Sequence, residues 1–321
     1  MAECLRRNIE KPGVLNYDDF RAFLTRMIAR GRVPQKYIDA FLSEKGMANF
    51  RKAFVHASWN ADPSENYEGY EFFGDSVISQ FVAFYIAYRW PHIKTSKWMS
   101  KIDHNLVGRK WIGRLAQNEG LSGFVLFGNS GAAKGKGPNF DMITALQANR
   151  DAATNDPYLA MMEDVMEAFF GCLMLTILAT KNPTTGVLFS HGAATQVCHN
   201  ILRTFFDPVE ISVAFEDVFD AVSRLKELYE AKELNPGQKP LRWSGPNAGG
   251  VFRYTELPDG KTECIVYGWP EGDRSVIPQN RRELGRAVEI NKDDAKQKAS
   301  KQALAVLKDR YGIVEKIPRY Q

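Results

Sequence analysis

Three acidic side chains in one short stretch of the sequence are spaced so that they could act together. Residues 66–77 read NYEGYEFFGDSV, and on a helix Glu68, Glu71 and Asp75 would share one face, at i, i+3 and i+7. The residues that follow, as far as Tyr88, are apolar almost all round, which predicts a buried helix. Acids on a buried helix are costly unless a cation meets them. The simpler alternative is a solvated acidic face on an ordinary amphipathic helix.

A second acidic stretch favours a shared site. Residues 162–175 read MEDVMEAFFGCLML, in which Asp164 and Glu167 are i, i+3 neighbours on an equally apolar helix. Two such helices that face each other would bring four carboxylates together, and their mutual repulsion would raise their pKa values. A divalent metal removes this conflict, and ligation by oxygen alone selects Mg²⁺ or Mn²⁺. In the alternative, Arg or Lys would neutralise the acids, but neither helix offers one close to both pairs.

The elements that must position these acids are helices. Apolar residues recur at helical spacing on both sides of the acidic stretches, in the segments 17–30, 34–46, 50–58, 94–116, 158–179 and 193–206. Asn66 and Ser64 are the candidate caps for the helix that carries the first acids. No segment in this part of the chain is a convincing strand, so the pattern predicts an all-α domain.

The character of the sequence changes after residue 215. One more amphipathic helix, around Val218 to Tyr229, is followed by β-type segments at 251–257 and 264–269, which flank the hairpin signal Asp259-Gly260. A third strand is expected at 284–290 and a final helix at 293–310. This order, α-β-β-β-α, predicts a small α+β domain.

These patterns divide the chain into two domains. We expect the helical domain at 16–207, a linker at 208–215, the α+β domain at 216–312 and a tail at 313–321. With 321 residues, the chain has the length of about two domains.

Composition and charge narrow the class of protein. Four cysteines without a CxxC pair indicate neither a zinc site nor a disulfide framework. Residues 235–321 hold 16 Lys/Arg and 11 Asp/Glu, a net charge of +5, whereas the 26 basic and 27 acidic residues before them leave −1. A basic small domain beside a neutral larger one suits a module that binds a polyanion.

The sequence also predicts where the protein resides. The first residues lack the apolar core of a signal peptide, and the longest apolar run, 168–179, is too short to span a bilayer. We therefore expect a cytoplasmic protein with no membrane association.

The acidic stretches resemble the motifs of a known family. NYEGYEFFGDSV looks like the signature of ribonuclease III, whose usual form is NERLEFLGDSVL, and DVMEAFFGCLML is similar to the family's second motif. VHAS at 55–58 and the stretch 99–128 are similar to the family's other elements. The resemblance covers about residues 20–205. Gly69 and Asp103 stand where the family commonly has arginine, so the departures affect the fit of the substrate and leave the acids in place.

The C-terminal part resembles a double-stranded-RNA-binding domain, the usual companion of that catalytic domain. Residues 291–307 read NKDDAKQKASKQALAVL and are similar to the start of the module's last helix. By this resemblance Lys292, Lys296 and Lys298 would bind RNA, and Asn247 would belong to a loop that reaches a minor groove, unless that loop only leads into the first strand.

The resemblance implies a function, a cofactor and a partner. Glu71, Asp75, Asp164 and Glu167 would be the catalytic acids that hold Mg²⁺, with Mn²⁺ as a substitute, and Glu68 would be an auxiliary acid. The protein would cut double-stranded RNA and leave 5′-phosphate and 3′-hydroxyl ends with a short 3′ overhang. Because one such domain makes one cut, two copies are needed to cut both strands, which implies a homodimer. The alternative is a catalytically silent RNA-binding or ribonucleoprotein subunit that keeps the fold.

Overall fold

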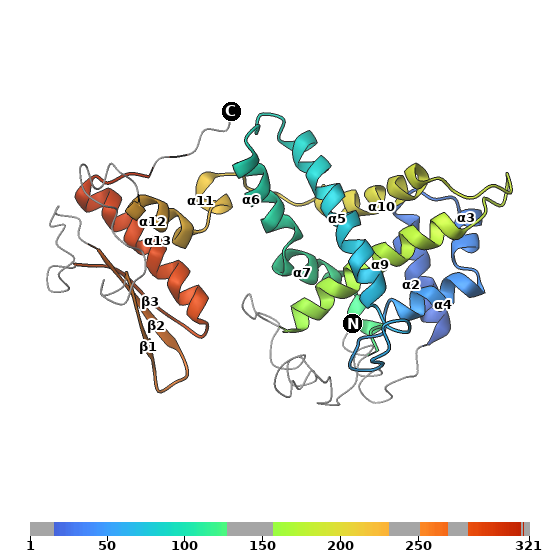
Figure 1. Ribbon diagram of the computed structural model, residues 1–321, viewed down its shortest axis with the longest axis horizontal. Coiled ribbons are helices and arrows are strands. Elements are labelled where there is room, and N and C mark those ends of the chain that lie inside the picture. The colour runs from blue at the N-terminus through green and yellow to red at the C-terminus, as the bar shows by residue number, and fades with distance from the viewer. Residues whose placement is uncertain (1–15, 127–156, 231–250, 269–281, 316, 318–321) are drawn as a thin grey trace. The chain divides into compact units, whose positions relative to one another are not determined.

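The computed structural model describes residues 16–126, 157–230, 251–268, 282–315 and 317 (Figure 1). The chain divides into two compact units, Met1–Ile211 and Ser212–Gln321. The expected boundaries at 207, 215 and 312 stay predictions, because a division into compact units does not fix where a domain ends.

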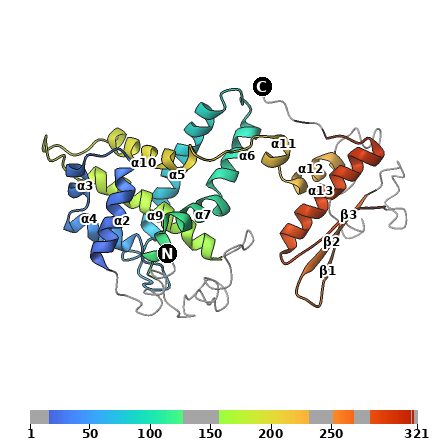
Figure 2. The same ribbon diagram turned by 180° about the vertical axis from the view of Figure 1, so that it is seen from behind.

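The described part of unit 1 is helical, which confirms the expected class. Its elements are α2 (Tyr17–Ala29), α3 (Gln35–Phe41), α4 (Glu44–Lys52), α5 (Glu68–Arg89), α6 (Ser96–Val107), α7 (Arg109–Glu119), the 3₁₀ turn η1 (Leu121–Gly123), α9 (Pro157–Ala179) and α10 (His191–Phe206). Figures 1 and 2 show α9 crossing α5 and α7, and the contacts of these helices agree. Phe169, Phe170 and most other apolar side chains of α9 are buried, so this helix forms the centre of the core.

Three expected helices of unit 1 are wrong in extent. The segment 34–46 was expected to be one helix, but α3 ends at Phe41 and Ser43 caps the separate helix α4. The segment 50–58 was expected to be helical throughout, but α4 ends at Lys52, and Val55 forms an isolated parallel bridge with Leu126. The segment 94–116 is two helices, because Gly108 between them is extended, with φ −72° and ψ 154°. At Gly108 the helical periodicity of the sequence continues, but the backbone leaves the helical region.

Unit 2 contains the expected small sheet. Its described elements are α11 (Phe215–Val218), α12 (Ala221–Glu230), β1 (Phe252–Glu256), β2 (Thr262–Gly268), β3 (Arg282–Glu289) and α13 (Lys292–Tyr311). The three strands are antiparallel in the order β1-β2-β3, with Tyr254 opposite Cys264 and Cys264 opposite Ala287. The β1–β2 connection holds Asp259 and Gly260, so the hairpin signal in the sequence is confirmed.

A second hydrophobic core lies between this sheet and α13. Alternate residues of the strands point to the helix, and small alanines of α13 (Ala295, Ala299, Ala303) let it lie close to them. α12 closes the same core with Leu225 and Leu228.

No helix in the described ranges of either unit is long and apolar enough to cross a membrane.

Candidate metal centre

The two acidic helices touch at a pair of glycines. A Cβ atom on Gly74 of α5 would lie 1.6 Å from the carbonyl oxygen of Glu167, and one on Gly171 of α9 would lie 2.0 Å from that of Tyr70. A Cβ at either place would overlap backbone atoms of the other helix, so α5 and α9 can lie this close only with glycine at both positions. This contact brings the acids of one helix to those of the other.

Three of the predicted acids share one site. Ligand oxygens of Glu71 on α5 and of Asp164 and Glu167 on α9 all lie within 4.8 Å of one another, and the three residues are half-buried. Asp75, one turn after Glu71, is exposed and does not belong to this group of three. Glu68 is exposed in the first turn of α5. The roles of Asp75 and Glu68 stay predictions.

The pKa of Glu167 is strongly raised. Its burial, followed by the negative charges of Glu163, Asp75, Asp164 and Glu71, raises the pKa of Glu167 to about 9. A set of carboxylate oxygens that repel one another at this distance suits a hard divalent cation such as Mg²⁺ or Mn²⁺. The residues present therefore fit the metal that the sequence predicted.

Glu163 and Asp103 also interact with the acids, and the sequence gave neither of them a role in binding metal. Glu163 is half-buried, and its burial raises its pKa, although Arg109 of α7 opposes this with an ion pair of 3.1 Å. Burial also raises the pKa of Asp103 on α6, against the charge of His104 and with help from Asp75. Glu163 could have been found because it lies one turn before Glu167 on the same helix.

Tyr67 is a residue that sequence reasoning missed. Its hydroxyl donates a hydrogen bond of 3.0 Å to Oδ2 of Asp164, across 97 positions of the sequence. Burial, and after it the charge of Asp164, raises the pKa of Tyr67, so the hydroxyl keeps its proton. No pattern in the sequence could have found this contact, since a tyrosine before an apolar helix is ordinarily a core residue.

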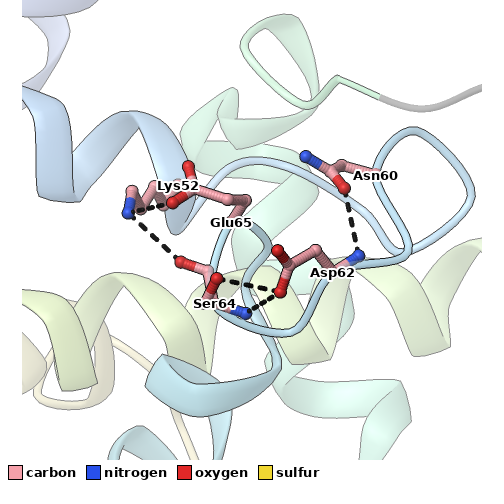
Figure 3. Close-up of polar contacts among 5 residues, drawn as sticks. All are labelled: Lys52, Asn60, Asp62, Ser64 and Glu65. Carbon is pink, nitrogen blue, oxygen red and sulfur yellow. Dashed lines mark hydrogen bonds and ion pairs between the residues drawn. The ribbon is translucent and has the colours of Figure 1, made fainter.

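The loop before α5 places Tyr67. Tyr67 is the N-cap of α5, and its side chain makes no capping bond. Asn66 lies one residue before it: its Oδ1 accepts from the backbone N–H of Glu68 at 3.0 Å, and its Nδ2 donates to the carbonyl of Asn60 at 3.0 Å. The expectation that Asn66 or Ser64 caps this helix is therefore wrong, although Asn66 does bond to the first turn. Figure 3 shows the rest of the loop, in which Asp62 accepts from both the backbone and the hydroxyl of Ser64.

Lys52 ties this loop to α4. Its Nζ lies 2.6 Å from Oε1 of Glu65 and donates to the carbonyl of Ser64 at 3.2 Å (Figure 3). The backbone N–H of Asp62 donates a hydrogen bond of 3.0 Å to Oδ1 of Asn60. These bonds fix the path of the chain into Tyr67 and α5.

Comparison with known families covers both acidic helices at once. Residues 68–177, which begin at Glu68 and include Asp164 and Glu167, match the family described as the Ribonuclease III domain. The chain carries a ribonuclease III domain. Its acids lie on the two helices that the match connects, and the sequence-based assignment to this family is confirmed.

Two viral proteins are similar to this chain over most of its length. Both are named "Putative ribonuclease 3". The protein of Invertebrate iridescent virus 6 is 24% identical over 94% of this chain and 91% of its own length. The protein of Frog virus 3 is 24% identical over 89% of this chain, which spans only 62% of that longer relative. These identities agree with a divergent member of the ribonuclease III family.

A bacterial relative and a solved structure complete the comparison. "Ribonuclease 3" of Geobacillus sp. (strain WCH70) is 25% identical over 85% of this chain and 89% of its own length. The nuclease domain of ribonuclease III from Campylobacter jejuni is 16% identical, covers 58% of this chain and 97% of its own, and has a TM-score of 0.37.

Unit 2 presents the lysines that the sequence singled out, in two different states. Nζ of Lys292 lies 4.3 Å from the centre of the Tyr254 ring, and Nζ of Lys296 lies 5.0 Å from that of Phe252, so β1 supports both lysines at the start of α13. Lys298 instead forms an ion pair with Glu289. Asn247 lies outside the described residues.

Proposed function

We propose that this chain is a divalent-metal-dependent endoribonuclease that cuts double-stranded RNA and leaves 5′-phosphate and 3′-hydroxyl ends with a short 3′ overhang. The observation that carries the proposal is the group formed by Glu71, Asp164 and Glu167 within a ribonuclease III domain. Three half-buried acids grouped at one helix crossing would destabilise the fold if they served packing alone.

The chain's own residues would hold the metal and direct the reaction. Glu71, Asp164 and Glu167 would bind Mg²⁺, or Mn²⁺ in its place, Asp75 would complete the set, and Glu68 would act as an auxiliary acid. When bound, such an ion supplies an activated water for in-line attack and neutralises charge on the phosphodiester. Since the pKa of Glu167 is raised, this carboxyl group would release its proton as the ion binds.

Unit 2 would bind the RNA duplex. We assign it the α-β-β-β-α order of a double-stranded-RNA-binding domain, over residues 216–312, after a linker at 208–215 and before a tail at 313–321. The first turns of α13 carry Lys292 and Lys296 over aromatic rings of β1, which limits their motion and leaves their charge available for phosphates. Lys298 would have to leave Glu289 before it could bind a phosphate.

The active form would be a homodimer, because one domain supplies one cut. α5 supports this proposal with an apolar face that points away from the core. Phe73, Phe84 and Tyr88 are exposed on it, Tyr88 by 85%, and their spacing places them within roughly 60° of rotation about the helix axis. Phe72, 73% exposed, extends this face beside the acids. A second copy that covered these rings would bury a large apolar area.

Phe84→Glu is expected to convert the dimer to a monomer, because a charge would enter an apolar interface. Size exclusion with light scattering should give twice the mass of one chain for the wild type and the mass of one chain for the variant. Leu188→Glu is the matched control, since Leu188 is 55% exposed and Phe84 54%, but Leu188 is not on α5. A wild-type protein that is monomeric at micromolar concentration contradicts the proposed dimer.

The activity is tested with end-labelled RNA duplex, in Mg²⁺ and in EDTA, beside single-stranded RNA and a DNA duplex of the same sequence. We expect short duplex products from the RNA duplex in Mg²⁺ alone, with 5′-phosphates that permit ligation. RNA duplex that is bound but left whole in Mg²⁺ and in Mn²⁺ would contradict the nuclease and favour a silent RNA-binding subunit.

A further inference from the structure

We propose that Tyr67 is a positioning residue of the metal centre: its hydroxyl holds the carboxylate of Asp164 in the orientation in which it meets Glu71 and Glu167. This inference rests on the proposed function, because it gives Tyr67 a part in metal binding.

The hydrogen bond to Asp164 comes from a side chain that cannot move freely. Tyr67 is 4% exposed, and its ring packs edge-on against the ring of His56, with centroids 5.5 Å apart and planes at 75°. Its backbone N–H donates to the carbonyl of Val55 at 3.0 Å. A donor fixed at both its backbone and its ring sets the direction of the bond that it makes.

The partner ring is fixed in turn. His56 Nδ1 lies 2.6 Å from the hydroxyl of Ser58 and accepts from the backbone N–H of Ser58 at 2.9 Å. The backbone N–H of His56 donates to the carbonyl of Leu126 at 2.9 Å, and Val55 forms a bridge with the same residue, so this segment is held against Leu126. The VHAS segment thus supports the metal centre through Tyr67, although none of its four residues belongs to the group of acids.

A phenol suits this task chemically. It is neutral and, with an ordinary pKa near 10, it donates a proton without removing the negative charge of the carboxylate. A lysine or arginine in its place would neutralise Asp164 and compete with a cation. The hydrogen bond at Oδ2 restricts rotation of the carboxylate and leaves its charge for a metal.

The decisive variant is Tyr67→Phe, which removes the hydroxyl and keeps the ring against His56. Mn²⁺ is titrated into the full-length protein without RNA, and free Mn²⁺ is measured by electron paramagnetic resonance. The variant should bind Mn²⁺ about 10- to 100-fold more weakly, the usual cost of losing a group that orients a metal ligand. Tyr85→Phe is the control, because the hydroxyl of Tyr85 is buried and has no hydrogen-bond partner among the described residues.

The Mg²⁺ dependence of cleavage separates positioning from a general loss of structure. If Tyr67 acts through the metal site, raising Mg²⁺ should restore the kcat of Tyr67→Phe toward that of the wild type, with an unchanged KM for RNA. Equal Mn²⁺ affinity of Tyr67→Phe, Tyr85→Phe and the wild type overturns the inference alone. A wild-type protein that binds no Mn²⁺ overturns the proposed function as well.

Discussion

Glu167→Gln is expected to abolish cleavage of duplex RNA and to leave the fold intact. The amide has the shape of the carboxyl group but supplies no negative charge, so the metal site keeps only Glu71 and Asp164 as anionic ligands from the group of three. Loss of a group that merely orients a ligand costs about 10- to 100-fold in metal affinity or activity, so loss of an anionic ligand should lower kcat by at least about a hundredfold. Gel analysis of labelled duplex in Mg²⁺ measures this.

The pKa of Glu167 gives the same variant a second signature. In the folded, metal-free protein this carboxyl keeps its proton up to a pH of about 9, whereas the unfolded chain releases it near 4.5. Between these values the folded state holds more protons, so the free energy of unfolding in EDTA should fall as pH rises. Glu167→Gln lacks this contribution and should lose less stability over that window. Wild-type affinity for Mg²⁺ should rise with pH over the same window, because binding displaces the proton.

Glu119→Gln is the control for both measurements. Glu119 is also half-buried, but it pairs with Arg30 at 2.7 Å, away from the acids. The Glu119→Gln variant should cut RNA at the wild-type rate. If Glu167→Gln cleaves RNA at the wild-type rate, Glu167 does not belong to the catalytic set. If the stability of Glu167→Gln depends on pH as that of the wild type does, the pKa of Glu167 is not raised.

Helical spacing was enough to predict that acids from two helices meet, but not which of them. Glu71 and Asp75 are four residues apart, about 6 Å along the axis of α5 and roughly 40° around it. Which of the two lies against Asp164 depends on the angle and place at which α9 crosses, and a sequence pattern carries neither. The structure groups Glu71 with Asp164 and leaves Asp75 exposed.

The remaining differences have the same origin in contacts between distant parts of the chain. Val55 forms a bridge with Leu126, and turns replace the helix in a segment whose periodicity is helical. The bond from Tyr67 to Asp164 joins residues that no local pattern relates. In unit 2, by contrast, the hairpin and the last helix depend on nearby residues, and the sequence predicted both within a few positions.

Gly74→Ala is expected to lower the free energy of unfolding by more than any substitution at an exposed position of the same helix. Its Cβ would lie 1.6 Å from the carbonyl oxygen of Glu167 and 2.9 Å from its Cα. These are backbone atoms, which cannot turn aside, so the cost should reach or exceed the upper end of the usual overpacking range, about 3 kcal/mol. Urea unfolding at constant Mg²⁺ measures this as a lower midpoint with an unchanged slope.

Gly69→Ala provides the contrast within α5. Among the described residues, no atom outside its chain neighbours and the backbone of its own helix lies within 4 Å of the Cβ that it would add. Alanine also favours a helix over glycine by up to about 1 kcal/mol, so this variant should be as stable as the wild type or more so. Equal midpoints for the two variants would contradict the close approach at Gly74. Because that approach also sets the separation of Glu71 from Asp164 and Glu167, Gly74→Ala should weaken Mn²⁺ binding even where the protein is still folded, and Gly69→Ala should not. The packing of the two helices and the geometry of the metal centre would then be one property of the chain, set by the absence of side chains at Gly74 and Gly171.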